Sequence, residues 1–303
     1  KSYRDNFSLD NFFIAVNNGV KTDRDSLFID DNKNHLSDRF RILLNRSFAP
    51  DFAEKYRVVN SGSFKILERI KLKSFDQSFI EPILYRPFDT RYIYYDPNIV
   101  SRPAQKVMKH MLKENLSLLS CRQQSTFDFQ HILITKNLSE VCTVSLQTKE
   151  TTYVFPLYIY SEEGSLVTNR TPNLNMEIVN QIADNIGLQF IPEKEVTKGT
   201  FAPIDILDYI YAVLHSPTYR EKYKEFLKID FPRVPYPENT ETFWQLIKLG
   251  AELRQIHLLE SPIVDHFMTK FPIGGNNQVK KVAFDSGKVW INDTQFFDCV
   301  PEI

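Results

Sequence analysis

Four basic side chains recur at helical spacing in the stretch SRPAQKVMKHMLK, residues 101–113, with no acidic residue among them. They are Arg102, Lys106, Lys109 and Lys113. At about 100° per residue they share one face of a helix, and apolar residues occupy the opposite face. Such a cationic stripe suits the phosphate backbone of a nucleic acid, where each neutralised phosphate releases counterions. The alternative is an ordinary amphipathic surface helix whose lysines contact only water.

A second group with chemical potential is Arg122, Gln123 and Gln124, which follow Cys121 at the expected end of a strand. Arginine pairs with O6 and N7 of guanine, and glutamine pairs with N6 and N7 of adenine. The stretch is therefore suited to contacting base edges. A polar surface loop has the same composition, so the residue types alone leave both interpretations open.

Basic residues are concentrated in one part of the chain. Between Lys55 and Arg122, thirteen Lys and Arg residues stand against six Asp and Glu residues, whereas the remaining positions hold 24 basic and 32 acidic residues. Since the net charge of the whole chain is −1, this distribution indicates one basic face; chance clustering is the alternative. Further candidates for phosphate contacts are Lys65, Arg69, Lys71, Lys73, Arg86 and Arg91.

The familiar motifs of catalysis are missing from the sequence. It contains no GxGxxG, GxxxxGK[ST], HExxH or GxSxG pattern. The three cysteines form no CxxC pair, and the six histidines never pair at metal-ligand spacing. We therefore assign no catalytic residue and no metal ligand, and we expect a binding module. Without a long apolar run or a signal-peptide segment, the expected location is the cytoplasm.

The elements that must position these residues form an α+β pattern. Strand-forming residues dominate 91–95, 115–120, 131–135 and 152–160, and Arg86-Pro-Phe-Asp89 is a turn sequence. Later residues are mostly helical: Ser216 and Pro217 start one helix, and a longer one is expected from Thr242, in a capping box, to Leu259. The end of the chain reads as a β-hairpin turning at Asp285-Ser-Gly-Lys288.

Five segments, in order along the chain, resemble the C-terminal specificity region of Type ISP restriction-modification enzymes. They are FFIAVNNGVKTDRDSLFID (12–30), ILYRPFDTRYIYYD (83–96), YVFPLYIY (153–160), YIYAVLHSPTYREKYKEFLKIDFPRVPYP (209–237) and KVWINDTQFFDCVP (288–301). In that family a helicase-like ATPase and a nuclease precede an N6-adenine methyltransferase, and a target recognition domain comes last.

The resemblance implies sequence-specific recognition of double-stranded DNA in bacterial defence against phage. The methyltransferase signatures of the family occur nowhere in the chain. The resemblance therefore implies a catalytic domain upstream of Lys1 that binds S-adenosylmethionine, while this chain itself needs no cofactor. It also implies a C-terminus cut short, because the family continues beyond the TQFFDCVP segment.

On this hypothesis the basic residues contact the DNA backbone, and loops such as 121–128 and 143–150 read the bases. Helices at 203–228 and 242–259 brace this region against the methyltransferase. A protein-interaction scaffold without direct base readout is the alternative. The expected regions are a mixed α/β DNA target-recognition region at 1–195, a helical bracing segment at 196–262 and a C-terminal β-hairpin region at 263–303.

Overall fold

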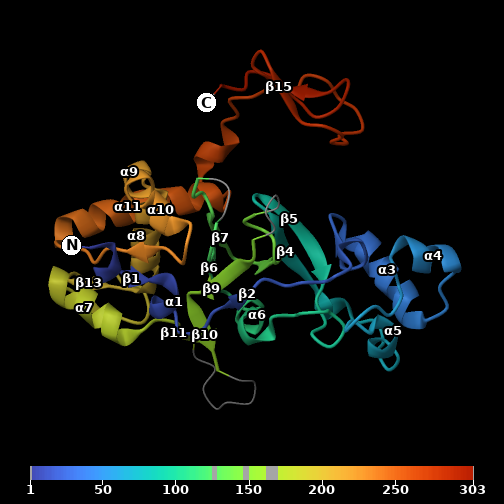
Figure 1. Cartoon of the computed structure of the whole chain (residues 1–303), viewed down its shortest axis with the longest axis horizontal. Coiled ribbons are helices and arrows are strands. Elements are labelled where there is room, and N and C mark those ends of the chain that lie inside the picture. The colour runs from blue at the N-terminus through green and yellow to red at the C-terminus, as the bar shows by residue number, and fades with distance from the viewer. Residues whose placement is uncertain (1, 125–127, 146–149, 162–169, 303) are drawn as a thin grey trace. The chain divides into compact units, whose positions relative to one another are not determined.

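The computed structural model describes residues 2–124, 128–145, 150–161 and 170–302 (Figure 1). It divides into two compact units, residues 1–258 and 259–303, and each is described by itself. No helix in the described ranges is long and apolar enough to cross a membrane. The expected α+β class is confirmed, with a β-rich part, a helical part and a small C-terminal sheet.

The centre of the larger unit is an antiparallel four-stranded sheet in the order β2-β9-β6-β7. Its strands are β2 (Asn17–Asn18), β9 (Thr152–Pro156), β6 (Ser117–Cys121) and β7 (Ile132–Thr135). Side chains alternate between the two faces of a strand, so Leu118 and Leu119 of β6 join two different hydrophobic cores. The sheet is therefore buried on both faces.

A second four-stranded sheet, β3-β5-β4-β8, lies on one side of the central sheet (Figure 1). Its strands are β3 (Ile29–Asp30), β5 (Asp89–Tyr94), β4 (Ile80–Arg86) and β8 (Leu138–Ser139). The helices whose residues share its core include α3 (Lys33–Asn45) and α6 (Gln105–Met111). Phe40 of α3 stacks on Tyr94 of β5 with ring centroids 3.9 Å apart, which fixes the helix on the sheet.

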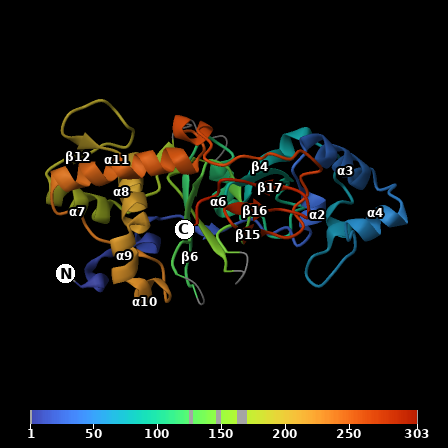
Figure 2. The same cartoon turned by 90° about the horizontal axis from the view of Figure 1, so that it is seen from above.

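Helices cover the other face of the central sheet. They are α7 (Met176–Ile186), α8 (Pro203–His215), α9 (Pro217–Lys222), α10 (Lys224–Leu227) and α11 (Thr240–His257). Figure 2 shows α11 crossing α8. The crossing is close because Gly250 has no side chain: a Cβ there would lie 1.9 Å from the carbonyl oxygen of Asp208. Beside it, Nε and Nη2 of Arg254 donate to the two carboxylate oxygens of Asp208, at 2.6 and 3.0 Å.

Short elements complete the larger unit. They are η1 (Tyr3–Asp5), β1 (Phe7–Ser8), α1 (Leu9–Phe12), α2 (Asp25–Phe28), α4 (Pro50–Lys55), α5 (Ile66–Arg69), η2 (Gln77–Phe79), β10 (Tyr158–Tyr160), β11 (Arg170–Pro172), β12 (Gln189–Phe190), β13 (Thr200–Phe201) and β14 (Arg233–Val234). Because β1 pairs with β14, the first residues of the chain close onto the helical part.

The smaller unit contains an antiparallel sheet in the order β15-β16-β17. Its elements are η3 (Pro262–Asp265), β15 (Ala283–Asp285), β16 (Lys288–Trp290) and β17 (Phe296–Phe297). The predicted hairpin is confirmed. Its two central turn residues, Ser286 and Gly287, have φ of +51° and +77°, the signs that a two-residue type I′ turn requires.

Two predicted helix starts are wrong. The helix expected over residues 101–113 begins only at Gln105, because the Arg102 backbone N–H and carbonyl oxygen both bond the backbone of Lys21. The long helix begins at Thr240, where the Asn239 side chain accepts from the Thr242 backbone N–H, so no capping box starts at Thr242. Local capping patterns were overridden by a tertiary contact in the first case and by a better cap in the second.

Candidate nucleic-acid interface

The turn between β4 and β5 exposes an aromatic ring at the hairpin tip. Pro87 takes the first central position, and Phe88 takes the second with φ of +63°, as a type II turn requires. The predicted turn is therefore confirmed. Phe88 is 55% exposed, and its unusual backbone angle places a large apolar group at the end of a rigid hairpin.

The arginines beside this tip are held by carboxylates. Arg86 Nη1 lies 2.7 Å from Glu140 Oε2, and Arg91 Nη2 lies 2.8 Å from Asp89 Oδ2. Both guanidinium groups also stack on Tyr85, with Cζ 3.8 and 4.4 Å from the ring centroid. These contacts brace the hairpin, because each cation has an anionic partner and an aromatic face.

A pocket of about 730 Å³ lies between the hairpin tip and the ends of the central sheet. We call it the loop pocket, because residues of both predicted readout loops line it. Its lining residues are Pro87, Phe88, Asp128, Gln130, His131, Ile132, Leu133, Val144, Ser145, His215, Arg220 and His257. The structure thus brings together two loops and a hairpin that are separate in the sequence. A concave surface with a few polar groups is the usual form of a binding site.

The helical wall of the loop pocket carries a cation. Arg220 Nε donates to the Leu214 carbonyl oxygen at 2.7 Å, and Nη2 lies 3.0 Å from Nδ1 of His215. Among the described residues, no carboxylate forms an ion pair with Arg220. Burial lowers the pKa of Arg220 and, with Arg220 beside it, lowers the pKa of His215 to about 3. His215 is therefore neutral at pH 7, and the positive charge of the wall belongs to Arg220.

A second histidine on this wall is also fixed. The Tyr211 hydroxyl lies 2.6 Å from Nδ1 of His257, and burial lowers the pKa of His257. The wall therefore presents one permanent cation and neutral rings. Such a set of groups can bind a phosphate or the acceptor atoms of a base.

The family model of the Type ISP C-terminal specificity domain matches residues 11–303. This chain belongs to that family. The match covers both compact units, which agrees with the resemblance seen in the sequence.

Solved structures resemble the specificity domain in fold. The structure titled "ATP-dependent Type ISP restriction-modification enzyme LlaBIII bound to DNA" has a TM-score of 0.72 and 21% identity, and the match covers 100% of this chain and 20% of that one. A DrdV–DNA complex has a TM-score of 0.68 and 23% identity, with 95% and 29% covered. A nuclease-deletion mutant of LlaGI with a DNA substrate mimic has a TM-score of 0.65 and 21% identity, with 99% and 24% covered.

These proteins are much longer than the present chain, which spans between a fifth and three tenths of their length. No protein with a curated description matches the specificity domain.

Some basic residues predicted to contact DNA have partners within the specificity domain. Arg69 Nη1 donates to the carbonyl oxygens of Ile99 and Val100, at 3.3 and 2.5 Å. Lys73 Nζ lies 3.0 Å from the carboxylate of Asp96, which is 1% exposed. Like Arg86 and Arg91, these two side chains already have a structural role.

Other predicted backbone contacts remain exposed to solvent in the specificity domain. They are Lys65, Lys71, Arg102, Lys106, Lys109 and Lys113. Only Lys106 and Lys109 lie on α6, while Arg102 precedes the helix and Lys113 follows its C-cap residue. Lys113 Nζ also lies 5.1 Å from the centroid of the Tyr160 ring. The four cations of the expected stripe are neighbours in sequence but do not form one continuous helical row.

The three predicted base readers differ in exposure. Arg122 is exposed, and its Nε lies 3.0 Å from the carboxylate of Asp230. Gln123 is exposed, whereas Gln124 is 1% exposed and its backbone N–H donates to the Lys228 carbonyl oxygen. In this conformation Arg122 and Gln123 can meet a ligand, and Gln124 is enclosed by protein.

Sequence reasoning missed several residues of the loop pocket. Arg220 lies in the run Tyr-Arg-Glu-Lys, which is an ordinary solvated helix turn by composition. Gln130 and His257 likewise stand alone in the sequence, far from the other pocket residues. Among the missed residues only Phe88 had a usable signal, because a turn at Arg86-Pro-Phe-Asp89 must expose the residues at its tip.

Proposed function

We propose that this chain recognises a sequence in double-stranded DNA and positions an upstream N6-adenine methyltransferase domain of the same polypeptide on its target. Membership of a specificity-domain family along residues 11–303 carries the proposal. Two of the similar structures are titled as Type ISP restriction-modification enzymes with DNA or a DNA mimic, which supports DNA as the ligand. S-adenosylmethionine would bind in the methyltransferase domain.

The positions of these side chains indicate which of them contact phosphates and which contact bases. The exposed side chains of Lys65, Lys71, Lys106, Lys109 and Lys113 contact phosphates without reading sequence.

Base edges are read around the loop pocket, where Asp128 of the 121–128 loop and Val144 and Ser145 of the 143–150 loop lie near the hairpin tip. Residues 125–127 and 146–149 of these loops lie outside the described residues. Arg220 on the pocket wall supplies donors for hydrogen bonds to bases or phosphates. Arg122 and Gln123, which are exposed outside the pocket lining, supply further donors.

Phosphate contact by the α6 region is tested by changing Lys106, Lys109 and Lys113 together to Ala. Binding of the chain to a random-sequence duplex is titrated against salt. Three lost phosphate contacts reduce the slope of log affinity against log salt by about 2.7. A control with the same charge change replaces the exposed lysines Lys198, Lys222 and Lys248. Equal slopes for the two triple variants would show that the α6 region does not contact the DNA backbone.

Base readout is tested in the full-length parent enzyme with Arg122→Ala and Gln123→Ala. Each change should relax the methylated sequence at one position, because a bidentate base contact is worth about 1–3 kcal/mol of discrimination. Gln189→Ala, at an exposed position on β12, is the control. An unchanged methylation site in both test variants would contradict the readout role of this loop. Absence of any salt-dependent duplex binding would favour a protein-interaction scaffold instead.

A further inference from the structure

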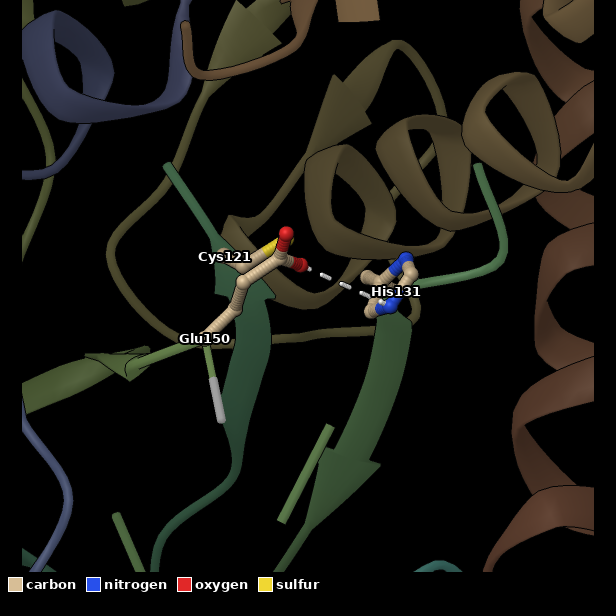
Figure 3. A group of neighbouring side chains, drawn as sticks. All are labelled: Cys121, His131 and Glu150. Carbon is tan, nitrogen blue, oxygen red and sulfur yellow. Dashed lines mark ion pairs between the residues drawn. The ribbon is translucent and has the colours of Figure 1, made fainter. Parts of the chain in front are cut away.

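Three side chains with metal-binding chemistry converge at one end of the central sheet: Cys121, His131 and Glu150 (Figure 3). The sulfur, one ring nitrogen and one carboxylate oxygen all lie within 4.8 Å of one another. The distance from His131 Nε2 to Glu150 Oε2 is 3.8 Å. This trio is separate from the cationic wall at Arg220, although His131 also lines the loop pocket.

The pairing of the strands creates this convergence. Ser120 of β6 is opposite Ile132 of β7, so Cys121 and His131 are the next pair in the same register. On the other side of β6, Cys121 is opposite Thr152 of β9. Glu150 precedes Thr152 by two residues, and residues two apart point to the same face of an extended chain. Three neighbouring strand ends therefore present a thiol, an imidazole and a carboxylate to one point.

The trio is largely withdrawn from water. Cys121 is 2% exposed, and the side chains of His131 and Glu150 are 10% and 13% exposed. Burial lowers the pKa of His131, so its ring is neutral at pH 7, which is the form that binds metals. The adjacent loop pocket gives an ion a path to His131.

We propose that Cys121, His131 and Glu150 bind one zinc ion. Thiolate, imidazole and carboxylate are the three ligand types that zinc takes in proteins, and the soft sulfur disfavours magnesium and calcium. Tetrahedral zinc at the usual bond lengths separates such ligand atoms by about 3.3–3.6 Å. Side-chain movements of roughly 1 Å would close the trio around the ion, with water as the fourth ligand.

The competing explanation is that the three side chains pack together without a metal. Burial, reinforced by the Glu150 carboxylate, raises the pKa of the Cys121 thiol to about 12. In the metal-free protein the thiol therefore keeps its proton and faces Glu150 and the neutral His131, whose pKa the nearby Arg220 also lowers. Zinc must displace this proton, because the thiolate is the ligand. Binding thus releases one proton.

A zinc ion here would tie together the roots of both candidate readout loops, since Cys121 directly precedes Arg122 and Glu150 ends the 143–150 loop. This consequence rests on the proposed function. The metal site itself does not, because it follows from the ligand geometry alone.

In the test, a chelator first removes any bound metal from the 303-residue chain. The metal-free chain is then titrated with Co²⁺ in the absence of DNA, and Zn²⁺ is added afterwards as a competitor. One equivalent of Co²⁺ should bind and give the charge-transfer absorption of a cobalt–thiolate bond. Cys121→Ser should abolish this band and weaken zinc binding at least 100-fold. Cys142→Ser is the matched control, because Cys142 is a half-buried free thiol outside the trio, and it should keep the band.

A second variant distinguishes loss of the metal site from unfolding of the chain. Glu150→Gln retains the sulfur and nitrogen ligands, so the band should persist with zinc affinity lowered 10- to 100-fold. Circular dichroism confirms that each variant is folded. No band in the unaltered chain, or its loss in Cys142→Ser, would overturn the proposal. A chain that binds duplex DNA but no cobalt leaves the proposed function intact, whereas cobalt binding without DNA binding leaves only the metal site.

Discussion

The arginines beside the two four-stranded sheets of the larger unit differ in whether a carboxylate pairs with them. In β3-β5-β4-β8, the arginines next to the hairpin each have a carboxylate: Arg86 pairs with Glu140, and Arg91 with Asp89. At the end of β2-β9-β6-β7, Arg220 has only neutral partners among the described residues. Matched charges hold a fold together, whereas a cation left without an anion at a pocket wall is suited to bind a ligand.

The sharpest test of this contrast removes a matched charge. Arg86→Gln leaves the Glu140 carboxylate, 5% exposed, without its cation. We expect the free energy of unfolding at pH 7 to fall by about 3 kcal/mol, the low end for a broken buried pair because Arg86 is partly exposed. Urea denaturation measures the change. Arg91→Gln is the control, and its more exposed pair should cost under about 1 kcal/mol.

The loss in Arg86→Gln should also depend on pH. Burial raises the pKa of Glu140 above its ordinary 4.5, while Arg86 lowers it, so the variant has a still higher pKa. A carboxyl with a raised pKa in the folded state favours folding while protonated and loses this contribution as pH rises through that pKa. The deficit against the unaltered chain should therefore be smaller at pH 5 than at pH 7. A constant deficit would contradict the assignment to Glu140.

Removing the unmatched cation should have a smaller effect on stability. Arg220→Gln keeps a donor for the Leu214 carbonyl oxygen but abolishes the partly buried charge. The free energy of unfolding should stay within about 1 kcal/mol or rise, because a partly buried charge without a counterion is costly. Duplex affinity should fall, with a salt slope lower by about 0.9 if the guanidinium meets a phosphate. Destabilisation as large as in Arg86→Gln, with unchanged DNA binding, would abolish the distinction between the two arginines.

The smallest effect is expected at the exposed pair of Arg122 and Asp230, where both side chains are 58% exposed. Asp230→Asn retains an oxygen for the Phe231 backbone N–H but releases Arg122. The denaturation midpoint should not change, because exposed ion pairs contribute little. Duplex affinity at low salt should rise a few-fold. The gain should vanish when Arg122→Ala is added, and a gain that survives would place its origin elsewhere.

Local patterns predicted most of the elements but not the sites. The strands around residues 117–121 and 132–135, the Ser216 cap and the turn at residues 285–288 follow from short-range rules, and the structure has them. The start of α6 failed because its cause, the contact of Arg102 with Lys21, joins residues 81 positions apart. No capping rule contains that information.

The site residues were harder to predict for the same reason. Cys121, His131 and Glu150 lie 10 and 19 positions apart, which matches no metal-binding motif. They meet only because β6 pairs with both β7 and β9. Whether Arg102, Lys106, Lys109 and Lys113 contact DNA stays a prediction, as does the division at residues 195 and 262.

The close crossing of α8 and α11 gives a pattern that can be searched for in other sequences. Gly250 and Arg254 are one helical turn apart, and both meet Asp208 of α8. A buried Asp in one helix followed, in a later long helix, by Gly-x-x-x-Arg therefore encodes both the distance and the ion pair of this crossing. Any side chain at position 250 would push the helices apart. Distant specificity domains with little overall identity can be screened for this spacing.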